Sequence, residues 1–316
     1  MLGATGFLAS CGTVLGLFSA SSWPAELASH FRLQYFAVLA ALAVAFLAAR
    51  RRRSALVFAA FALTNFAAIL PLYRADTVRV AASVTRFRVM LSNVYADNER
   101  FDLVLEAVER YAPDVLVVEE VRPAWAKRLA ALASVYPHSV VEARDDNFGI
   151  ALYSRHALTE PTVLYLGDVG IPSIAVEVEI GPTPLYVVAT HPVPPAGGWY
   201  SSARNDQLEK IGRYMRNAPR PAILVGDLNV TPWSSYFSRL LLDADLQDSM
   251  KGYGPQLTWP VELWPARIPI DHCLYSSGVR VINRQVGSFV GSDHYPLIVD
   301  LEVGGPAGTM KASYER

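Results

Sequence analysis

The chain has 316 residues, enough for one large domain or two small ones, and a formal net charge of −1 from 28 Lys and Arg against 29 Asp and Glu. Residues 1–74 contain six Arg and a single acid, Glu26, which leaves 22 basic and 28 acidic residues from residue 75 onward. That second part is therefore acidic, and this argues against non-specific binding of duplex DNA, which usually needs a basic face. The only two cysteines, Cys11 and Cys273, lie in different parts, so we expect no internal disulfide.

Three apolar segments occupy the N-terminal quarter, at about residues 2–20, 34–49 and 54–73. Each has almost no charge and is close to the length that a helix needs to cross a bilayer. A buried helix of a soluble protein is the alternative for any one of them. Three in tandem favour a membrane anchor over residues 1–75, with about three transmembrane helices in a bacterial-type inner membrane.

The run Arg50–Arg53 fills the short connection between the second and third apolar segments and is expected to stay cytoplasmic. That orientation predicts a periplasmic or extracytoplasmic location for the domain that follows. Further basic residues after the third segment nearly balance the count and leave the opposite orientation open: Arg74, Arg79, Arg86 and Arg88.

After a linker at 76–85, the pattern changes to short apolar strands that alternate with amphipathic helices, up to a flexible tail at 303–316. Strands are expected near 87–94, 113–121, 148–154, 162–166, 173–179, 185–190, 222–226, 270–275, 279–284 and 296–302. Helices are expected over about 98–111, 123–136 and 201–217. Many strands with interspersed helices predict one layered α/β domain over residues 86–302.

Strand after strand in this domain ends in, or is followed by, a residue that can bind a metal or carry a proton. These residues are Asn93, Glu120, His191, Asp227 with Asn229, Asp271, and Asp293 with His294. Each alone has a structural explanation as a turn residue, a cap or a core histidine. Because strand ends gather at the edges of a sheet, the ordered set predicts one shared site.

The ordered motifs resemble the endonuclease/exonuclease/phosphatase superfamily, which includes DNases, exonuclease III-like enzymes and sphingomyelinases. The matching segments are Asn93, PDVxxxxE at 113–120, GxALxSR at 149–155, TH at 190–191, GDxN at 226–229, ID at 270–271 and SDH at 292–294. The resemblance implies a four-layer α/β sandwich, with two mixed sheets flanked by helices, and a phosphoester hydrolase that uses Mg²⁺ or Mn²⁺.

The resemblance also implies a role for each residue. Asn93, Glu120 and Asp293 are the expected metal ligands, His294 the general base held by Asp271, and His191 a phosphate or leaving-group contact. Asp227 and Asn229 are expected to orient the nucleophile and bind phosphate. Two residues depart from the family pattern: Glu119 stands where Gln is common, and Leu228 where Phe is common.

The sequence leaves the substrate open between nucleic acid and a phosphorylated lipid or headgroup at the bilayer, and no obligate protein partner is expected. An inactive membrane scaffold is the non-enzymatic alternative. Arg204, in the helix after a Pro/Gly-rich loop, is expected either to bind substrate or to pair with a surface acid. Several loop aromatics are candidates for contact with a ligand or the bilayer: Trp199, Tyr200, Trp233, Trp259 and Trp264.

Overall fold

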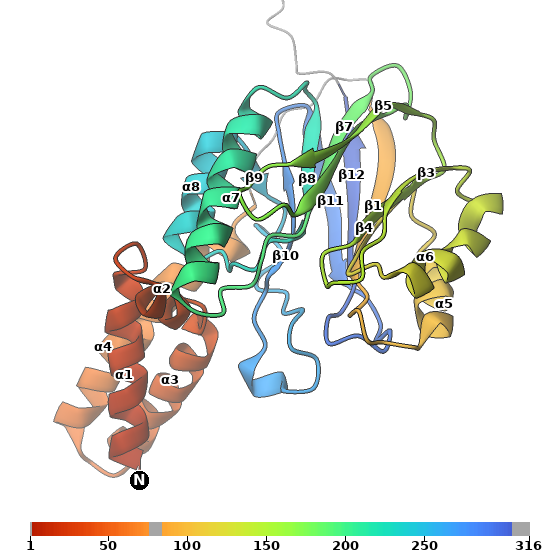
Figure 1. Cartoon of the computed structure of the whole chain (residues 1–316). Coiled ribbons are helices and arrows are strands. Elements are labelled where there is room, and N and C mark those ends of the chain that lie inside the picture. Colours follow the sequence, from red (N-terminus) through yellow and green to blue (C-terminus); the bar gives the residue numbers. More distant parts are fainter. Residues whose placement is uncertain (1, 76–83, 305–316) are drawn as a thin grey trace, which may run out of the picture.

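Two six-stranded sheets stack face to face in the computed structural model, which describes residues 2–75 and 84–304 (Figure 1). The first sheet has the order β11 (Val279–Val286), β12 (Leu297–Val303), β1 (Thr85–Asn93), β2 (Val115–Glu119), β4 (Ile150–Ser154) and β3 (His138–Glu142). The second has the order β5 (Leu158–Tyr165), β6 (Pro172–Val178), β7 (Leu185–Thr190), β8 (Ala222–Asp227), β10 (Asp271–Tyr275) and β9 (Gln247–Asp248). Both sheets are mixed, because β1 with β2 and β7 with β8 are parallel while the other pairs are antiparallel.

Helices cover the outer face of each sheet. The first sheet carries α5 (Phe101–Tyr111), α6 (Pro123–Leu129) and the short 3₁₀ turn η2 (Ala130–Ser134), and the second carries α7 (Gly198–Arg216) and α8 (Ser235–Ala244). Strands covered on both faces need apolar residues throughout, which explains why β2, β4, β8 and β10 are buried along their whole length. The expected four-layer sandwich is therefore confirmed.

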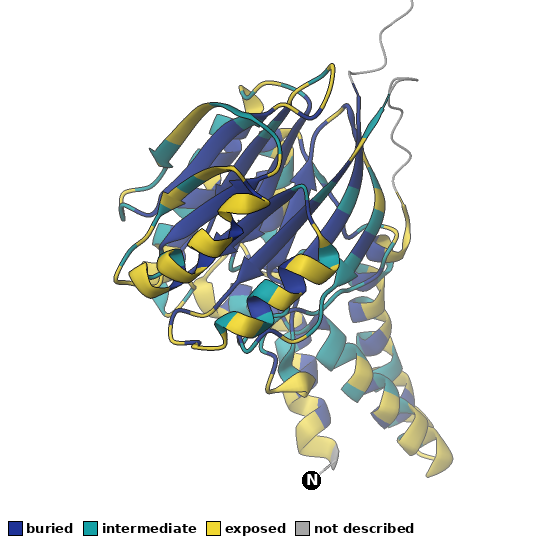
Figure 2. Cartoon of the chain, turned by 90° about the vertical axis from the view of Figure 1, so that its right-hand side faces the viewer, coloured by how far each residue is buried: buried dark blue, intermediate teal, exposed yellow. Residues whose placement is uncertain are grey.

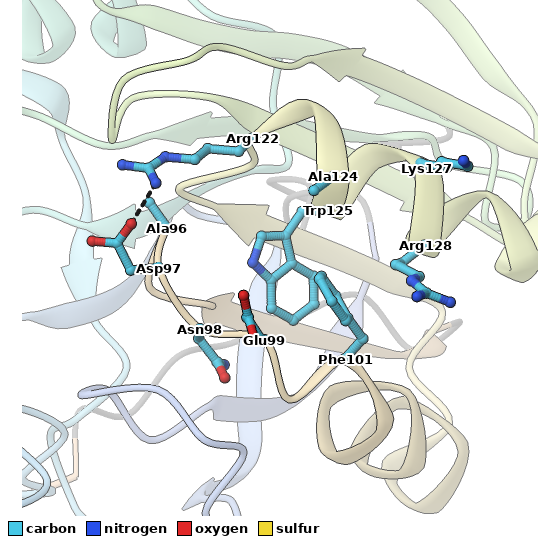
Figure 3. A pocket seen from close by; sticks show the side chains of 10 residues that line it. All are labelled: Ala96, Asp97, Asn98, Glu99, Phe101, Arg122, Ala124, Trp125, Lys127 and Arg128. Carbon is cyan, nitrogen blue, oxygen red and sulfur yellow. Dashed lines mark hydrogen bonds and ion pairs between the residues drawn. The ribbon is translucent and has the colours of Figure 1, made fainter.

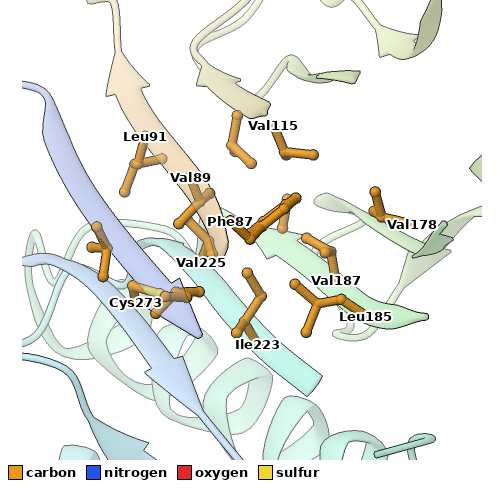
Figure 4. Packing of buried hydrophobic residues seen from close by; sticks show 14 of the residues in the cluster. Phe87, Val89, Leu91, Val115, Val178, Leu185, Val187, Ile223, Val225 and Cys273 are labelled. Carbon is orange, nitrogen blue, oxygen red and sulfur yellow. The ribbon is translucent and has the colours of Figure 1, made fainter. Parts of the chain in front are cut away.

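The central core fills the space between the two sheets with side chains such as Phe87, Val187 and Ile223 (Figure 4). Burial of one such side chain stabilises the fold by about 1.5–3 kcal/mol. In Figure 2 the strands are mostly buried, whereas the outer sides of the helices are exposed. The core holds the strand ends in fixed positions, and the site described below depends on that.

Several elements were not expected from the sequence. The edge strand β3 is half exposed and lacks a buried face, so its apolar pattern is weak. Helix α8 is capped by Ser234, whose hydroxyl accepts a hydrogen bond from the backbone N of Tyr236. Nearly all of the expected linker and tail lie outside the described residues.

The N-terminal region folds into helices α1 (Leu2–Leu17), α2 (Trp23–Ser29), α3 (Arg32–Ala48) and α4 (Arg52–Ile69), then the 3₁₀ turn η1 (Leu70–Tyr73). Among the described residues, one stretch, Arg52–Tyr73, is long and apolar enough to cross a membrane, and the bent pair of α2 and α3 would be a second. Three transmembrane helices are therefore not confirmed. The shortfall arises because α1 and α3 have only 16 and 17 residues, fewer than the roughly 20 that a span needs.

Candidate active site

The predicted site residues meet at one edge of the sandwich. Strand β1 ends at Asn93 and its parallel neighbour β2 ends at Glu119, directly before Glu120. In the second sheet β8 ends at Asp227, and the antiparallel strand β10 begins at Asp271, directly opposite Asp227 in the register. Because parallel strands end at the same edge and antiparallel partners begin there, residues distant in sequence become neighbours.

Gly226, the glycine of the GDxN motif, permits a close approach between β8 and β7. A Cβ atom at this position would lie 1.8 Å from the carbonyl oxygen of Thr190 and 2.9 Å from Oε1 of Glu119. The next residue, Asp227, donates its backbone N–H to the Glu119 carboxylate, at 3.0 and 3.3 Å from the two oxygens. A glycine is therefore required for the two sheets to meet here.

His294 lies between two carboxylates. Its Nδ1 is hydrogen bonded to Oδ2 of Asp271 at 3.0 Å, and its Nε2 lies 3.6 Å from Oδ2 of Asp227. The hydrogen bond to Asp271 fixes the orientation of the ring and leaves Nε2 facing Asp227. The sequence predicted the pairing with Asp271, and the two side chains are in contact.

Burial and mutual charge shift the pKa values of these three groups. Burial alone would lower the pKa of His294, but the charges of Asp271 and Asp227 outweigh it and raise that pKa to about 10. Burial raises the pKa of Asp227 to about 6, although His294 opposes the shift. Burial also acts to raise the pKa of Asp271, but the charge and hydrogen bond of His294 lower it below its usual value. The charge of each group therefore depends on the charges of the other two.

His191 lies on the other side of Asp227. Its Nδ1 is 3.2 Å from the carbonyl oxygen of Asp227, and its Nε2 is 3.9 Å from Oε1 of Glu120. The ring of Phe148 lies 5.8 Å from the imidazole, between centroids. The imidazole of His191 thus lies between Asp227 and Glu120, which is one of the predicted metal ligands.

Glu120 is held at the edge by two donors. Asn93 Nδ2 donates to its Oε1 at 3.1 Å, and the backbone N of Ala96 donates to its Oε2 at 2.9 Å. The backbone of Glu120 has a φ of 62°, in the left-handed region that non-glycine residues seldom occupy. On the neighbouring loop, Asp293 accepts a hydrogen bond of 2.9 Å from Nε1 of Trp259.

The donor atoms at this edge fit a hard divalent cation. Among the described residues no three His, Cys, Asp or Glu side chains are grouped to hold a metal by themselves. Mg²⁺ nevertheless usually binds through one or two carboxylates and completes its shell with water and substrate phosphate. The carboxylates of Glu120 and Asp293 would supply such a partial set, and the amide oxygen of Asn93, which here accepts from the backbone N of Tyr95, would have to turn to join them. The surrounding excess of buried carboxylates would be offset by a cation.

Glu119, the departure from the family pattern, is fully buried beneath the site. Burial and the charge of Asp227 raise its pKa well above the ordinary value for Glu. Its two oxygens share one donor, the backbone N of Asp227, and Oε2 lies 3.8 Å from Nδ1 of His191. Glu119 therefore joins the two sheets and adds an acid close to the catalytic residues.

Asn229 follows Asp227 in a left-handed conformation with a φ of 51°. Its backbone N donates to Oδ1 of Asp227 at 2.9 Å, and its side-chain amide donates to the carbonyl of Pro192 at 2.9 Å. The turn thus orients the Asp227 carboxylate.

The structure does not support a substrate contact by Arg204. The side chain is fully buried, and its guanidinium donates to Glu26 in α2 and to the carbonyl of Asn229. Its partner acid is likewise fully buried, so the alternative of a surface ion pair is also wrong. Arg204 lies behind the site rather than in it.

A cavity of about 640 Å³ lies between the loop after β1 and α6, and one of its lining residues, Ala96, donates its backbone N–H to Glu120 (Figure 3). Arg122, two residues after Glu120, forms an ion pair with Asp97 across its mouth, and the indole of Trp125 lies against Phe101 in its wall. The cavity therefore offers both charged and apolar surface next to the predicted metal ligands.

Sequence reasoning missed Ser292, Phe148 and Glu26. The hydroxyl of Ser292 donates to the carbonyl of Asn93 at 2.8 Å and accepts from the backbone N of His294, so it joins the two ends of the site. Its place in the SDH motif was the available signal. Trp259, expected as a ligand or bilayer contact, instead binds Asp293.

Comparison with known proteins gives one family and a set of similar folds. Residues 90–294 match the sequence profile described as the Endonuclease/Exonuclease/phosphatase family. A search of curated proteins finds no match. Among solved structures, an endonuclease/exonuclease/phosphatase from Bacteroides vulgatus is 22% identical, with a TM-score of 0.58 over 69% of this chain and 99% of that one.

Two further solved structures, of differently named proteins, have the same architecture. D. rerio TDP2, complexed with a single strand DNA product, is 18% identical, with a TM-score of 0.59 over 68% of this chain and 98% of that one. Sphingomyelinase C from Streptomyces griseocarneus is 19% identical, with a TM-score of 0.52 over 68% and 99%. At these identities the likeness shows the fold alone.

Proposed function

Because the chain belongs to the endonuclease/exonuclease/phosphatase family, whose members are hydrolases acting on phosphoester bonds, we propose that it is a Mg²⁺- or Mn²⁺-dependent phosphodiesterase. The observation that carries the proposal is the position of His294 between Asp271 and Asp227, on the same strand edge as Glu120. A proton-transfer unit beside a set of oxygen donors is what hydrolysis of a phosphoester by water requires.

Glu120, with Asn93 and Asp293 beside it, would hold the metal. When bound, the ion supplies positive charge to a non-bridging phosphate oxygen and to the leaving oxygen. Trp259 fixes one oxygen of Asp293 and the backbone N of Ala96 fixes one oxygen of Glu120, so the ligands are oriented in advance.

In the proposed reaction a water attacks phosphorus and the ester P–O bond breaks. The water's proton passes to Asp227, whose Oδ2 lies 3.6 Å from Nε2 of His294. His294, whose raised pKa keeps it protonated, is held by Asp271 at Nδ1 and directs its Nε2–H toward Asp227. His191, across Asp227, is placed to bind phosphate or to protonate the leaving oxygen.

The test uses the full chain in detergent with bis-p-nitrophenyl phosphate and Mg²⁺, Mn²⁺ or EDTA. We expect hydrolysis with metal, none with EDTA, and a loss of about 100-fold or more in His294→Ala, which removes the partner of the proton-accepting Asp227. His138→Ala is the matched control, because His138 is exposed on β3, away from the site. Metal-dependent activity that survives His294→Ala would refute the mechanism.

A phosphorylated lipid headgroup is the second candidate substrate, and one observation favours it over nucleic acid. The loop that carries η3 (Trp264–Ala266) extends from the sandwich on the side where α1, α3 and α4 also lie (Figure 1). At its tip Leu263 and Trp264 are 59% and 73% exposed. Exposed Trp and Leu beside apolar helices suit a protein at a membrane surface, where Trp is enriched.

The substrate classes are separated by one panel: single- and double-stranded DNA, RNA, sphingomyelin in vesicles and inositol phosphates. Preference for the vesicle substrate would support the lipid candidate, and preference for DNA or RNA the nuclease. Membrane insertion and an extracytoplasmic catalytic domain are part of the proposal. A C-terminal alkaline phosphatase fusion, active only when exported, tests that orientation.

A further inference from the structure

The loop that follows β8 is contacted along its length by the N-terminal helical region. This loop, residues 228–234 before α8, carries Asn229. His30 Nδ1 is hydrogen bonded to Thr231 Oγ1 at 2.9 Å, and Ser234 Oγ donates to Glu26 Oε1 at 2.9 Å. The backbone N of Ser235, the first residue of α8, donates to Ser19 Oγ at 3.3 Å. A further contact is indirect, because Arg204 of α7 donates both to Glu26 and to the carbonyl of Asn229. The catalytic loop is therefore packed against a part of the chain that lies about 200 residues earlier.

Glu26 is the centre of these contacts. It is the only acid in residues 1–74, and its side chain is fully buried where α2 meets α7. One carboxylate oxygen accepts from the guanidinium of Arg204 and the other from the hydroxyl of Ser234. A carboxylate is tolerated at full burial only when it is paired and hydrogen bonded, so the two donors must stay in place for the region to remain packed.

Arg204 connects Glu26 to the active site. Its planar guanidinium donates in three directions, to Glu26, to Asn205 and to the backbone carbonyl of Asn229. Asn229 has a left-handed backbone, which asparagine adopts more readily than most residues, and its N–H donates to the carboxylate of Asp227. Arg204 binds the carbonyl oxygen of the same residue, so it helps to fix the turn on which the orientation of Asp227 depends.

We propose that Glu26 is a positioning residue for phosphoester hydrolysis: through Arg204 it holds Asn229, and through Asn229 it holds Asp227, in the active conformation. The N-terminal helical region thus helps to position active-site residues, in addition to its proposed role as a membrane anchor. The inference rests on the proposed function for its catalytic consequence, but the hydrogen-bond chain itself is independent of the substrate.

The test compares three variants of the full chain. Glu26→Gln keeps the shape and removes the charge. Arg204→Lys keeps a positive charge for Glu26, but a single ammonium does not reproduce the planar fork that reaches both Glu26 and Asn229. Ser19→Ala is the matched control, because it removes a contact between the same two regions that does not lead to Asn229. The measurements are kcat and KM with bis-p-nitrophenyl phosphate, the melting temperature, and hydrogen–deuterium exchange of residues 227–235.

We expect Glu26→Gln and Arg204→Lys each to lower kcat about tenfold or more with little change in KM, since small displacements of catalytic groups act on the chemical step. Exchange in residues 227–231 should accelerate in both variants, whereas β12 should stay as in the wild type and Ser19→Ala should change only the amide of Ser235, whose acceptor it removes. A melting temperature that falls while kcat stays within about twofold of the wild-type value would show that Glu26 is only structural and would overturn the proposal.

The exchange data separate this inference from the proposed function. If the wild-type chain hydrolyses no phosphoester with any metal, the proposed function is wrong, and acceleration confined to residues 227–235 would still support the positioning of Asn229 by Glu26. Unchanged exchange in both variants would overturn the positioning, whatever the activity.

Discussion

Replacing Glu119 by Gln should stabilise the protein, and the gain should grow with pH. Glu119 is fully buried, and the pKa of its carboxyl is raised by burial and by the neighbouring charge of Asp227. Gln has nearly the same shape, and its amide oxygen can still accept the hydrogen bond from the backbone N of Asp227. The substitution therefore removes a buried charge without removing the contact between the sheets.

The magnitude follows from two opposing effects. Removing a poorly solvated buried charge is worth about 1–3 kcal/mol, and weakening a charged hydrogen bond to a neutral one costs about 1 kcal/mol. The net gain is at most about 2 kcal/mol, which for a domain of this size raises the melting temperature by up to roughly 8 °C at pH 8.

The pH dependence has a definite sign. The unfolded carboxyl ionises near the ordinary Glu value of 4.5, whereas the folded carboxyl keeps its proton to higher pH. The stability that protonated Glu119 contributes is therefore fully present below about pH 4.5 and is lost as the pH rises through the raised folded pKa. Gln loses nothing over that range, so the difference between Glu119→Gln and the wild type should be small at pH 4.5 and largest at pH 8.

The assay is calorimetric melting of the full chain in detergent and EDTA, from pH 4.5 to 8. Glu109→Gln, on the exposed face of α5, is the matched control and should show no such trend. A Glu119→Gln melting temperature that is lower than that of the wild type, or a difference that does not change with pH, would refute the reasoning.

Two further predictions concern the same edge. Gly226→Ala should destabilise the fold by about 3 kcal/mol or more, because the new Cβ would lie 1.8 Å from the carbonyl oxygen of Thr190. Urea unfolding measures this change. A variant as stable as the wild type would contradict the close approach of β8 and β7. Asp271→Asn should lower kcat by about 100-fold or more while KM changes little, because the ring of His294 loses its fixed orientation; a change confined to KM in steady-state kinetics would argue against this role.

Apolar patterning in the sequence was sufficient to predict the layered fold. Continuous apolar runs such as Val115–Val118 are required of strands covered on both faces, and they predicted the central strands of both sheets. Strand β3 was not predicted, because an edge strand without a buried face has no regular pattern of apolar residues in its sequence. The three transmembrane helices were predicted from apolar length alone, and the structure does not confirm that number, because α1 and α3 have only 16 and 17 residues.

The chemical identity of the site could also be predicted, because Asn93, Glu120, His191 and Asp227 end or directly follow an apolar strand, and Asp271 begins one. The motifs bring together Asp271, His294 and Asp227, and the structure shows these three side chains in contact. The sequence could not assign their protonation, since the pKa values of His294 and Asp227 depend on burial and on charges contributed by other strands.

What the sequence by itself determined is therefore the local chemistry: which strands are buried, and which polar side chains stand at their ends. Only the tertiary structure decided what lies behind those side chains. Glu26 and Arg204 are 178 positions apart, and no periodicity or motif joins them. Their pairing follows from the physical need to neutralise two buried charges where α2 packs on α7, and that need exists only once the chain has folded.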